Sequence, residues 1–319
     1  SDKSLQGKKT AHGVTLSHII KSGTENPEST IGCYAGDQES YKVFAGLFNP
    51  IIKTYHNKKI SGQHPKNTNI DGIDFSGIDS SYIVSTRVRV ARNLAAFAFP
   101  SYISKKDRGK VEILIQPAFS KLSKNLAGKY FPLDSMSEQQ KNQLMVDHYL
   151  FKKGDKFLES AGINRDWPDN RGIFISNDRK FIAWVNEEDH MRIISMNKGG
   201  NFKAVFIKLF DAINQLSVNL DFAFDDSLGY LNSCPTNIGT AMRASVHIKI
   251  PLLSEKEDFK KICSALGLDV RGVDGEHSES KEGIFDISNI ARFGVSEREI
   301  LQTLVDGIRT LINLEKSLS

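Results

Sequence analysis

A cysteine followed by a row of cations is the part of this sequence best suited to chemistry. Cys234 stands before residues 235–239, which contain proline, asparagine and glycine and so predict a turn that lifts the thiol out of regular structure. Residues 242–250 then alternate polar and apolar side chains, as a strand with one packed face does. The polar face carries Arg243, Ser245, His247 and Lys249. We therefore expect a thiol beside a surface that can meet an anion.

Arginines recur on other predicted strands. Residues 82–90 alternate in the same way and place Arg87 and Arg89 on one face, while Arg192 and Arg271 stand in or near further strands. A single such arginine is usually a surface cation in a weak ion pair, but several that leave one sheet match the charge of a polyphosphate. Neither a G-x-x-x-x-G-K-[ST] nor a G-x-G-x-x-G run occurs. Arginines, rather than a P-loop, are thus expected to hold any nucleotide.

An acidic tip, Glu187-Glu188-Asp189-His190, joins two of the predicted strands. Such a tip is commonly a solvated turn, yet here it is rooted in apolar strands and stands next to Arg192, which favours a functional site. Metal binding by these residues fits no zinc spacing, and we predict no protein-held metal.

Cys234 itself allows two interpretations. The Thr236 hydroxyl and the downstream Arg243 favour a lowered thiol pKa, and a nucleophilic thiol would take His247 as its base. The residues alone therefore leave three hypotheses open. They are an arginine-clamped phosphoryl-transfer enzyme, a cysteine-dependent hydrolase using Cys234 and His247, and a non-catalytic binder of acidic ligands.

Composition narrows the class of protein. The 319 residues are 39% hydrophobic and 25% charged, as in ordinary globular proteins. The 42 basic and 38 acidic residues are scattered along the chain and give a net charge of +4. This distribution does not indicate a basic surface that binds nucleic acid or a membrane. No apolar run approaches the roughly 18 residues of a membrane span, and no signal-peptide pattern opens the chain. Three cysteines favour reduced thiols, so we expect a cytoplasmic protein.

The pattern of elements predicts an α+β fold with an antiparallel sheet. Residues 39–55 have helical spacing, and the Gly-, Asn- and Asp-rich stretch that follows marks a boundary. We predict a helical N-terminal domain over 1–70, a linker over 71–80 and a catalytic domain over 81–319. Within the last, we expect helices over 105–124, 137–152 and 202–216, a helix capped by Ser254, and a final helix opened by the capping box Ser296 and Glu299.

Four motifs resemble the signatures of one family, the phosphagen (ATP:guanidino) kinases. They are Ser-Thr-Arg-Val-Arg at 85–89, Val-Asn-Glu-Glu-Asp-His at 185–190, Cys-Pro-Thr-Asn-Ile-Gly-Thr at 234–240 and Arg-Gly at 271–272. The short loop at 28–34 and the run Gly275-Glu276-His277 are most similar to those of arginine kinases. The resemblance covers nearly the whole chain.

The resemblance implies a small helical domain, whose first helices in the family would precede residue 1, and a larger domain with an antiparallel sheet flanked by helices. It implies reversible transfer of the ATP γ-phosphoryl group to L-arginine, or alternatively to taurocyamine or another guanidino compound. It also implies Mg²⁺ bound with ATP or ADP, a monomer, and a function in ATP buffering.

The resemblance also assigns residues to the two substrates. Arg87, Arg89, Arg192, Arg243 and Arg271 would bind the phosphates. Ser85, His247 and Asp286 would lie near adenine and ribose. Glu188, Glu276 and Cys234 would surround the guanidinium as the catalytic groups. Ser29, Ile31 and Tyr34 would bind the other end of the guanidino substrate.

Elementary chemistry agrees with these assignments. A guanidinium is a poor nucleophile, so carboxylates must align it and accept a proton as the N–P bond forms. Arginines and Mg²⁺ stabilise charge on a loose, metaphosphate-like transition state. Cys234, as a thiolate, would tune the guanidinium electrostatically rather than attack. The glycine-rich segment after Arg271 would act as a lid that delivers Glu276 and excludes water.

We predict that Glu276→Gln lowers kcat by more than about tenfold and changes ATP binding less, because this carboxylate would be used mainly in the transition state. Steady-state kinetics and nucleotide titration measure the two effects separately. Unchanged turnover would remove Glu276 from the mechanism.

Overall fold

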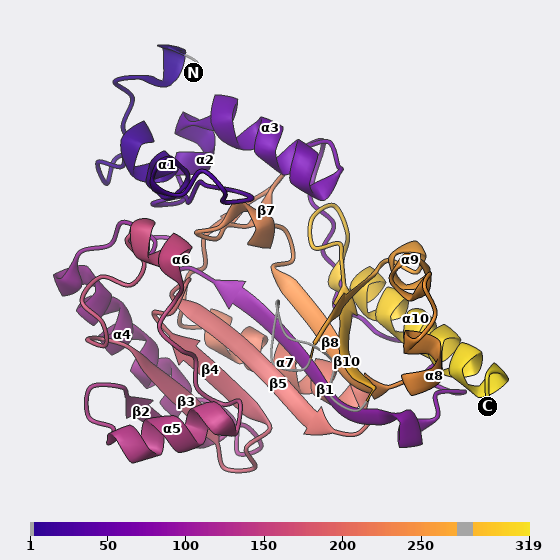
Figure 1. Ribbon diagram of the computed structural model, residues 1–319. Coiled ribbons are helices and arrows are strands. Elements are labelled where there is room, and N and C mark those ends of the chain that lie inside the picture. The colour runs from indigo at the N-terminus through magenta and orange to yellow at the C-terminus, as the bar shows by residue number, and fades with distance from the viewer. Residues whose placement is uncertain (1–2, 273–282) are drawn as a thin grey trace.

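An eight-stranded antiparallel sheet forms the centre of the molecule, in the strand order β2-β3-β4-β5-β1-β8-β10-β9 (Figure 1). The computed structural model describes residues 3–272 and 283–319. The strands are β1 (Ile83–Arg92), β2 (Gly128–Pro132), β3 (Gly172–Ser176), β4 (Phe181–Val185), β5 (Met191–Lys198), β8 (Met242–Lys249), β9 (Leu268–Arg271) and β10 (Ile284–Asn289). A separate small pair joins β6 (Phe224–Asp225) to β7 (Gly229–Tyr230). The predicted α+β class with an antiparallel sheet is confirmed.

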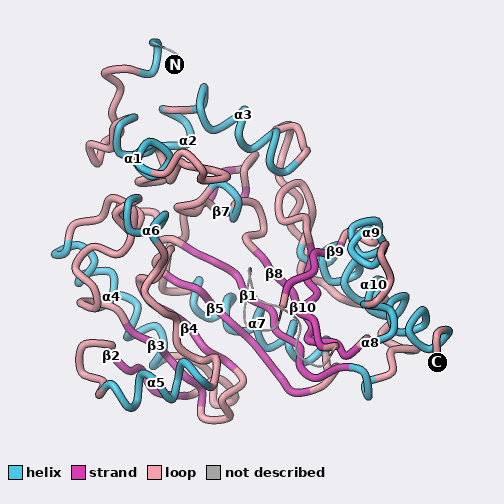
Figure 2. Tube along the Cα trace, in the orientation of Figure 1, coloured by secondary structure: helices cyan, strands magenta, loops and turns pink. Residues whose placement is uncertain are grey.

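Ten α-helices are described, and they lie at one end and on both sides of these strands (Figure 2). They are α1 (Leu16–Glu25), α2 (Ser40–Val43), α3 (Ala45–His56), α4 (Lys105–Ser120), α5 (Glu138–Val146), α6 (Lys156–Ser160), α7 (Phe202–Ser217), α8 (Pro251–Ser254), α9 (Phe259–Ala265) and α10 (Glu297–Ser317). Short 3₁₀ turns stand at Lys3–Leu5, Ser80–Tyr82 and Pro235–Asn237. Within the described parts of the chain, no helix combines the length and apolar character that a membrane span needs.

One face of the sheet carries the main core. Along β1 the apolar side chains of Val88 and Val90 point to this face and are fully buried, as the alternation predicts. Helices α4, α7 and α10 supply the opposing apolar surface. On α10 the capping box of Ser296 and Glu299 is present, so the predicted start of that helix is confirmed. Arg87 and Arg89 lie on the opposite face of β1.

Several of the predicted helix boundaries were wrong. The helix predicted over 105–124 ends at Ser120, and the helical spacing over 39–55 is divided between α2 and α3. Helix α5 ends at Val146 instead of continuing to Lys152, because His148 adopts a left-handed φ of 59° that stops helical hydrogen bonding. Ser254 does not cap a helix; it ends α8, and its hydroxyl donates to the Pro251 carbonyl. The next helix, α9, begins after Asp258.

The N-terminal helices α1, α2 and α3 gather at one end of the sheet (Figure 1). Their buried apolar residues form a second core, which includes Phe44, Phe48 and Ile52. That core also takes in Phe99 and Phe293 from the larger part of the chain. The helical region therefore packs directly against the segments around the sheet.

The predicted domain limits stay a prediction, but the segment placed at the boundary has a clear structural function. Arg298 of α10 donates to the carbonyls of Asn69 and Asp71 at 2.8 and 2.6 Å. About three turns further on, Arg309 donates to the carbonyls of Ser76 and Asp74. The extended segment is thus bound along α10 by hydrogen bonds to its main-chain carbonyls.

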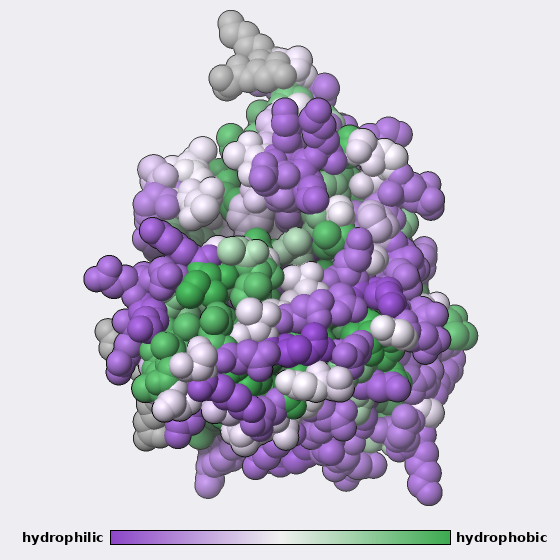
Figure 3. All heavy atoms as spheres, turned by 90° about the vertical axis from the view of Figure 1, so that its right-hand side faces the viewer, coloured by the Kyte–Doolittle hydropathy of each residue, from purple (hydrophilic) through white to green (hydrophobic). Residues whose placement is uncertain are grey.

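Polar residues cover most of the face around α9 and α10 (Figure 3).

We predict that Leu304→Ala lowers the free energy of unfolding by roughly 2–5 kcal/mol, because Leu304 of α10 is fully buried against the sheet. Urea unfolding followed by circular dichroism measures it. Val146→Ala is the control, since Val146 is 72% exposed, and it should change stability by less than about 0.5 kcal/mol. Equal effects of the two substitutions would contradict this packing of α10.

Candidate active site

The predicted arginines meet on the face of the sheet opposite the main core. Arg89 on β1 pairs with Arg243 on β8, and Ala91 pairs with Arg192 on β5. Directly paired and alternate residues of a sheet share a face, so Arg87 lies on the same side. Trp184 on β4 contacts both edges of the group, with its ring centroid 5.7 Å from the guanidinium carbons of Arg87 and Arg192.

A second row crosses four strands on the same face. Ser85 pairs with His247, His247 with Asp286, and Asp286 with Arg271. The family resemblance assigned these four residues to the nucleotide from separate parts of the chain, and the register of β1, β8, β10 and β9 brings them together. His148, which sequence reasoning missed, stands close enough for its charge to contribute to lowering the pKa of His247, behind the larger effect of burial.

Crowding perturbs the arginines themselves. Burial, reinforced by the neighbouring Arg243, lowers the pKa of Arg87 to about 10. Burial and the positive charge of Arg192 lower the pKa of Arg89 well below its ordinary value. Like charges held this closely are stabilised when an anion binds between them.

Three carboxylates, paired with two of the arginines, partly neutralise the cluster. Arg192 donates from Nη1 to Glu187 Oε1 at 2.9 Å and from Nη2 to Glu188 Oε2 at 3.1 Å. Although burial opposes its charge, these carboxylates raise the pKa of Arg192. Arg243 Nη2 donates to Asp286 Oδ2 at 2.8 Å, and this contact lowers the pKa of Asp286 against the effect of burial.

Glu188 is a buried carboxylate of the acidic tip with a strongly perturbed pKa. Burial raises its pKa to about 7, even though Arg192 opposes the rise. The adjacent Asp189 is buried and accepts from the Ser233 main-chain N–H at 2.7 Å. This bond fixes the tip against the turn that contains Cys234. The tip is therefore a hydrogen-bonded turn with Asp189 buried, and not the solvated turn that was the alternative to a functional site.

The Cys234 turn contradicts one sequence prediction. The thiol is 7% exposed and its Sγ lies 3.1 Å from the Thr236 hydroxyl. The expected lowering of its pKa was wrong: burial and the negative charge of Glu188 raise the pKa of Cys234, and the Thr236 hydrogen bond only partly opposes this. His247 lies along β8 beside Ser85 and Asp286 and is not placed as a base for this thiol.

The N-terminal domain holds the same turn through its main chain. Tyr41 Oη donates to the Asn232 carbonyl at 2.6 Å, and the Ala35 N–H donates to the Ser233 carbonyl at 2.7 Å. His56 Nε2 lies 2.9 Å from the Pro235 carbonyl, and burial lowers the pKa of this histidine to about 4. Since a neutral histidine donates through one ring nitrogen, we assign Nε2 as the donor.

The predicted substrate loop lies next to these groups. Ile31 and Tyr34 pack in one apolar cluster with Cys234. Burial, with the nearby Cys234 and Glu188, raises the pKa of Tyr34. Ser29 is half-buried, and its Oγ accepts from the Gly32 N–H at 3.0 Å.

The loop is fixed from both sides. Gly23 of α1 and Gly32 approach so closely that a Cβ at either would lie 2.8 Å from the other's backbone. Glu28 pairs with Lys156 at the start of α6. Glu276, the remaining predicted catalytic residue, falls outside the described residues.

A narrow cavity lies where the arginines meet the Cys234 turn. Its lining residues are Arg89, Val90, Ala91, Arg192, Asn237, Ala241, Arg243 and Arg292. Sequence reasoning overlooked Asn237 and Arg292. Asn237 belongs to the quoted motif, whereas Arg292 follows β10 in a stretch without a recognisable pattern. Among the described residues, no three His, Cys, Asp or Glu side chains could jointly hold a metal ion.

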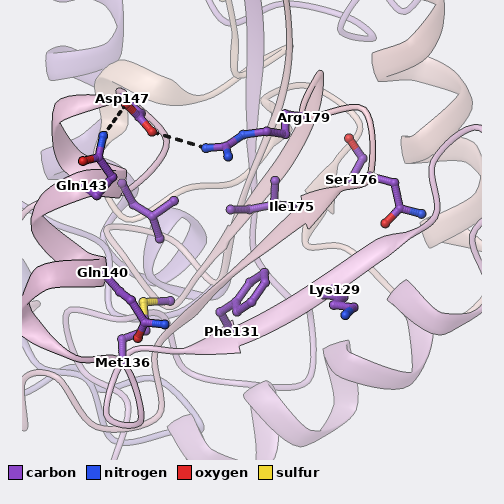
Figure 4. A pocket seen from close by; sticks show the side chains of 11 residues that line it. Lys129, Phe131, Met136, Gln140, Gln143, Asp147, Ile175, Ser176 and Arg179 are labelled. Atoms are coloured by element: carbon purple, nitrogen blue, oxygen red, sulfur yellow. Dashed lines mark hydrogen bonds and ion pairs between the residues drawn. The ribbon is translucent and has the colours of Figure 1, made fainter.

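A second pocket, of about 410 Å³, lies further along the same sheet face beneath α5 (Figure 4). Phe131, Met136 and Ile175 give it an apolar wall. At its rim Arg179 donates to Asp147 at 3.4 Å. It shares no lining residue with the arginine cavity, and the titratable groups predicted from sequence converge on the latter. We therefore take the arginine cavity as the candidate active site.

Comparison with protein families agrees with this geometry. The model described as ATP:guanido phosphotransferase, C-terminal catalytic domain, matches residues 110–318. The model described as ATP:guanido phosphotransferase, N-terminal domain, matches residues 3–53. This chain belongs to the ATP:guanido phosphotransferase family.

The chain is also similar to individual members of this family. It is 46% identical to an arginine kinase of Anthopleura japonica over 98% of this chain, which spans 45% of that relative's length. It is also 46% identical to a probable arginine kinase of Caenorhabditis elegans, again over 98% of this chain and over 88% of the relative.

Solved structures show the same fold. A crystal structure of a lombricine kinase aligns with a TM-score of 0.93 at 41% identity, covering 98% of this chain and 88% of that one. A substrate-free duplicated taurocyamine kinase from Schistosoma mansoni aligns with a TM-score of 0.92 at 41% identity, covering 98% of this chain and 45% of that one.

The raised pKa of Cys234 predicts slow alkylation by iodoacetamide in the ligand-free protein, with a rate that keeps rising from neutral pH to about pH 10. Glu188→Gln should accelerate the reaction at about pH 8, because one neighbouring negative charge is removed. Mass spectrometry of the Cys234 peptide measures the rate.

Cys263 is the internal control, since burial alone raises its pKa to about 12 and the Glu188 substitution should not change its rate. A rate at Cys234 that reaches a plateau near neutral pH would show that a thiolate already exists without ligand.

Proposed function

We propose that this protein reversibly transfers the γ-phosphoryl group of ATP to the guanidino group of L-arginine, by direct in-line transfer. The observation that carries the proposal is the single sheet face on which the arginine cluster meets the Glu188 carboxylate and the Cys234 turn. A polyanion and a cation can bind side by side there. Membership of the family and the arginine kinases among its relatives support the same function.

The nucleotide would occupy the face formed by β1, β5, β8 and β9. Arg87, Arg89, Arg192, Arg243 and Arg271 would bind its phosphates. Their crowding favours an anion between them and places positive charge where the transition state develops negative charge. Ser85, His247 and Asp286 form one row beside them and would accommodate ribose and adenine.

The guanidino group would lie between Glu188 and Cys234, with Glu276 completing the site. Glu188 must be ionised to bind a guanidinium, and its pKa of about 7 in the ligand-free protein is lowered when a positive charge binds beside it. The same positive charge favours a Cys234 thiolate. Binding of the guanidinium would thus lower both pKa values that burial raises, that of Glu188 and that of Cys234.

Mg²⁺ would enter with the nucleotide as part of the substrate. The described residues offer it no carboxylate cage, which fits an ion bound chiefly by phosphate oxygens and water. It would supply charge neutralisation at the phosphates. The protein's own part is to hold those phosphates through its arginines and to align the guanidine through Glu188.

Arginine is the proposed acceptor because the loop at 28–34 is short and tightly packed on α1. Ile31 and Tyr34 would enclose the amino-acid end of the substrate next to Cys234. Taurocyamine and other guanidino compounds are the alternatives. The three described free cysteines agree with a reducing compartment, and we propose a cytoplasmic monomer that buffers ATP.

The cysteine-dependent hydrolase is the less favoured function. It needs a thiolate activated by an adjacent base, but the pKa of Cys234 is raised and His247 lies elsewhere on β8.

We predict that a coupled ADP-release assay with arginine, creatine, taurocyamine, glycocyamine and lombricine gives the highest kcat/KM for arginine. Higher activity with taurocyamine would overturn the proposed substrate and leave the class of enzyme intact. Nucleotide binding without transfer to any of the five compounds would overturn the enzymatic proposal.

A further inference from the structure

We propose that Arg292 is a positioning residue for the transfer: it orients the amide of Asn237 so that this amide donates to Glu188 and aims the carboxylate at the guanidine. The inference rests on the proposed function and extends it to two residues that line the arginine cavity and were missed in the sequence.

Arg292 is fixed at both of its ends. Its carbonyl accepts from the Thr240 main-chain N–H at 3.0 Å and from the Thr240 hydroxyl at 2.9 Å, just before β8 begins. Its Nη1 donates to Asn237 Oδ1 at 2.5 Å, and the same nitrogen lies 3.4 Å from the Thr236 carbonyl. Its guanidinium is therefore committed to the turn that carries Cys234.

This contact determines the orientation of the Asn237 amide. A guanidinium has only donors, so the atom that faces Arg292 must be the Asn237 oxygen. The Asn237 nitrogen is then turned toward the tip and donates to Glu188 Oε1 at 3.2 Å. Without Arg292, either end of the amide could face Glu188, and a carbonyl oxygen there would repel the carboxylate.

Both oxygens of Glu188 consequently have a donor. Arg192 donates to Oε2 and Asn237 to Oε1, from opposite sides of the carboxylate. These two hydrogen bonds favour the ionised form of Glu188 and fix the plane of its carboxylate. A fixed carboxylate can align the guanidine closely, and such alignment of a reactant contributes strongly to the rate. Arg292 acts on the guanidine only through this relay.

Other titratable groups also face Glu188 and must be left unchanged in any test. On the tip they are Glu187, Asp189 and Arg192; from the other packed elements they are Cys234 and Tyr34. None of them is altered by substitution of Asn237 or Arg292.

A double-mutant cycle tests the relay in the full chain. We expect Arg292→Met and Asn237→Ala each to lower kcat/KM for the guanidine substrate at least tenfold. We expect the double variant to fall within about twofold of the more damaging single variant, because the two residues act in series. Quenching of the protein's tryptophan fluorescence by MgATP should give a Kd changed by less than threefold in all three proteins.

Two results would overturn the inference. Effects that multiply in the double variant would show that Arg292 acts independently of Asn237. A tenfold or larger loss of MgATP affinity in Arg292→Met would make Arg292 a phosphate ligand instead.

The variant Asn237→Asp tests the same inference if Arg292→Met or Asn237→Ala fails to fold. It retains the acceptor for Arg292 and nearly the same shape, but it cannot donate to Glu188 when ionised. The acid limb of kcat/KM for the guanidine should move to higher pH, because the ionised form of Glu188 loses a donor and gains a negative neighbour. A wild-type pH profile in this variant would contradict the relay.

Arg92→Met is the matched control. Arg92 is buried, donates to the Thr240 carbonyl at 3.2 Å and stacks on Tyr230, but it does not reach Asn237 or Glu188. Its loss should lower stability and leave the acid limb in place. If the wild-type protein transfers no phosphoryl group to any guanidine, the proposed function fails; if it does and the Asn237 and Arg292 variants match it, only the relay fails.

Discussion

The guanidinium of Arg192, buried between Glu187 and Glu188, is the contact on which the site depends. It joins the arginine cluster to the acidic tip, so the anion-binding and cation-binding halves share one ion-paired group. Buried ion pairs are weak as a source of stability, but they fix geometry because an unpaired partner would be left uncompensated. The sheet holds this arrangement through the strand register, and the main core behind it is chiefly apolar packing.

The segment 232–237, which contains Cys234, is where the parts of the chain converge. The N-terminal domain binds its backbone through Tyr41 and His56, the acidic tip binds it through Asp189, and Arg292 binds it through Asn237. A thiol placed by so many bonds is well suited to stand beside a substrate. Its raised pKa follows from the same enclosure, because water is excluded and Glu188 is near.

Sequence patterns predicted those features that depend on local periodicity or capping. The alternation in residues 82–90 placed Arg87 and Arg89 on one face, and Ser296 with Glu299 marked the start of α10. The shift in the pKa of Cys234 was predicted with the wrong sign. The adjacent sequence shows Thr236, whose hydrogen bond lowers this pKa, but it does not show the burial of the thiol or the nearby Glu188, which raise it. Arg292 was missed for a similar reason, since only the register of β8 and β10 brings it to the turn.

Direct transfer between the two halves of the site is the central claim, and stereochemistry at phosphorus tests it most directly. ATP made chiral at the γ-phosphoryl group with oxygen isotopes is turned over with arginine, and the configuration of the phosphorylated product is determined. A single in-line displacement predicts inversion. Retention would require two displacements and a phosphorylated side chain of the protein, which would contradict transfer from ATP straight to the guanidine held by Glu188.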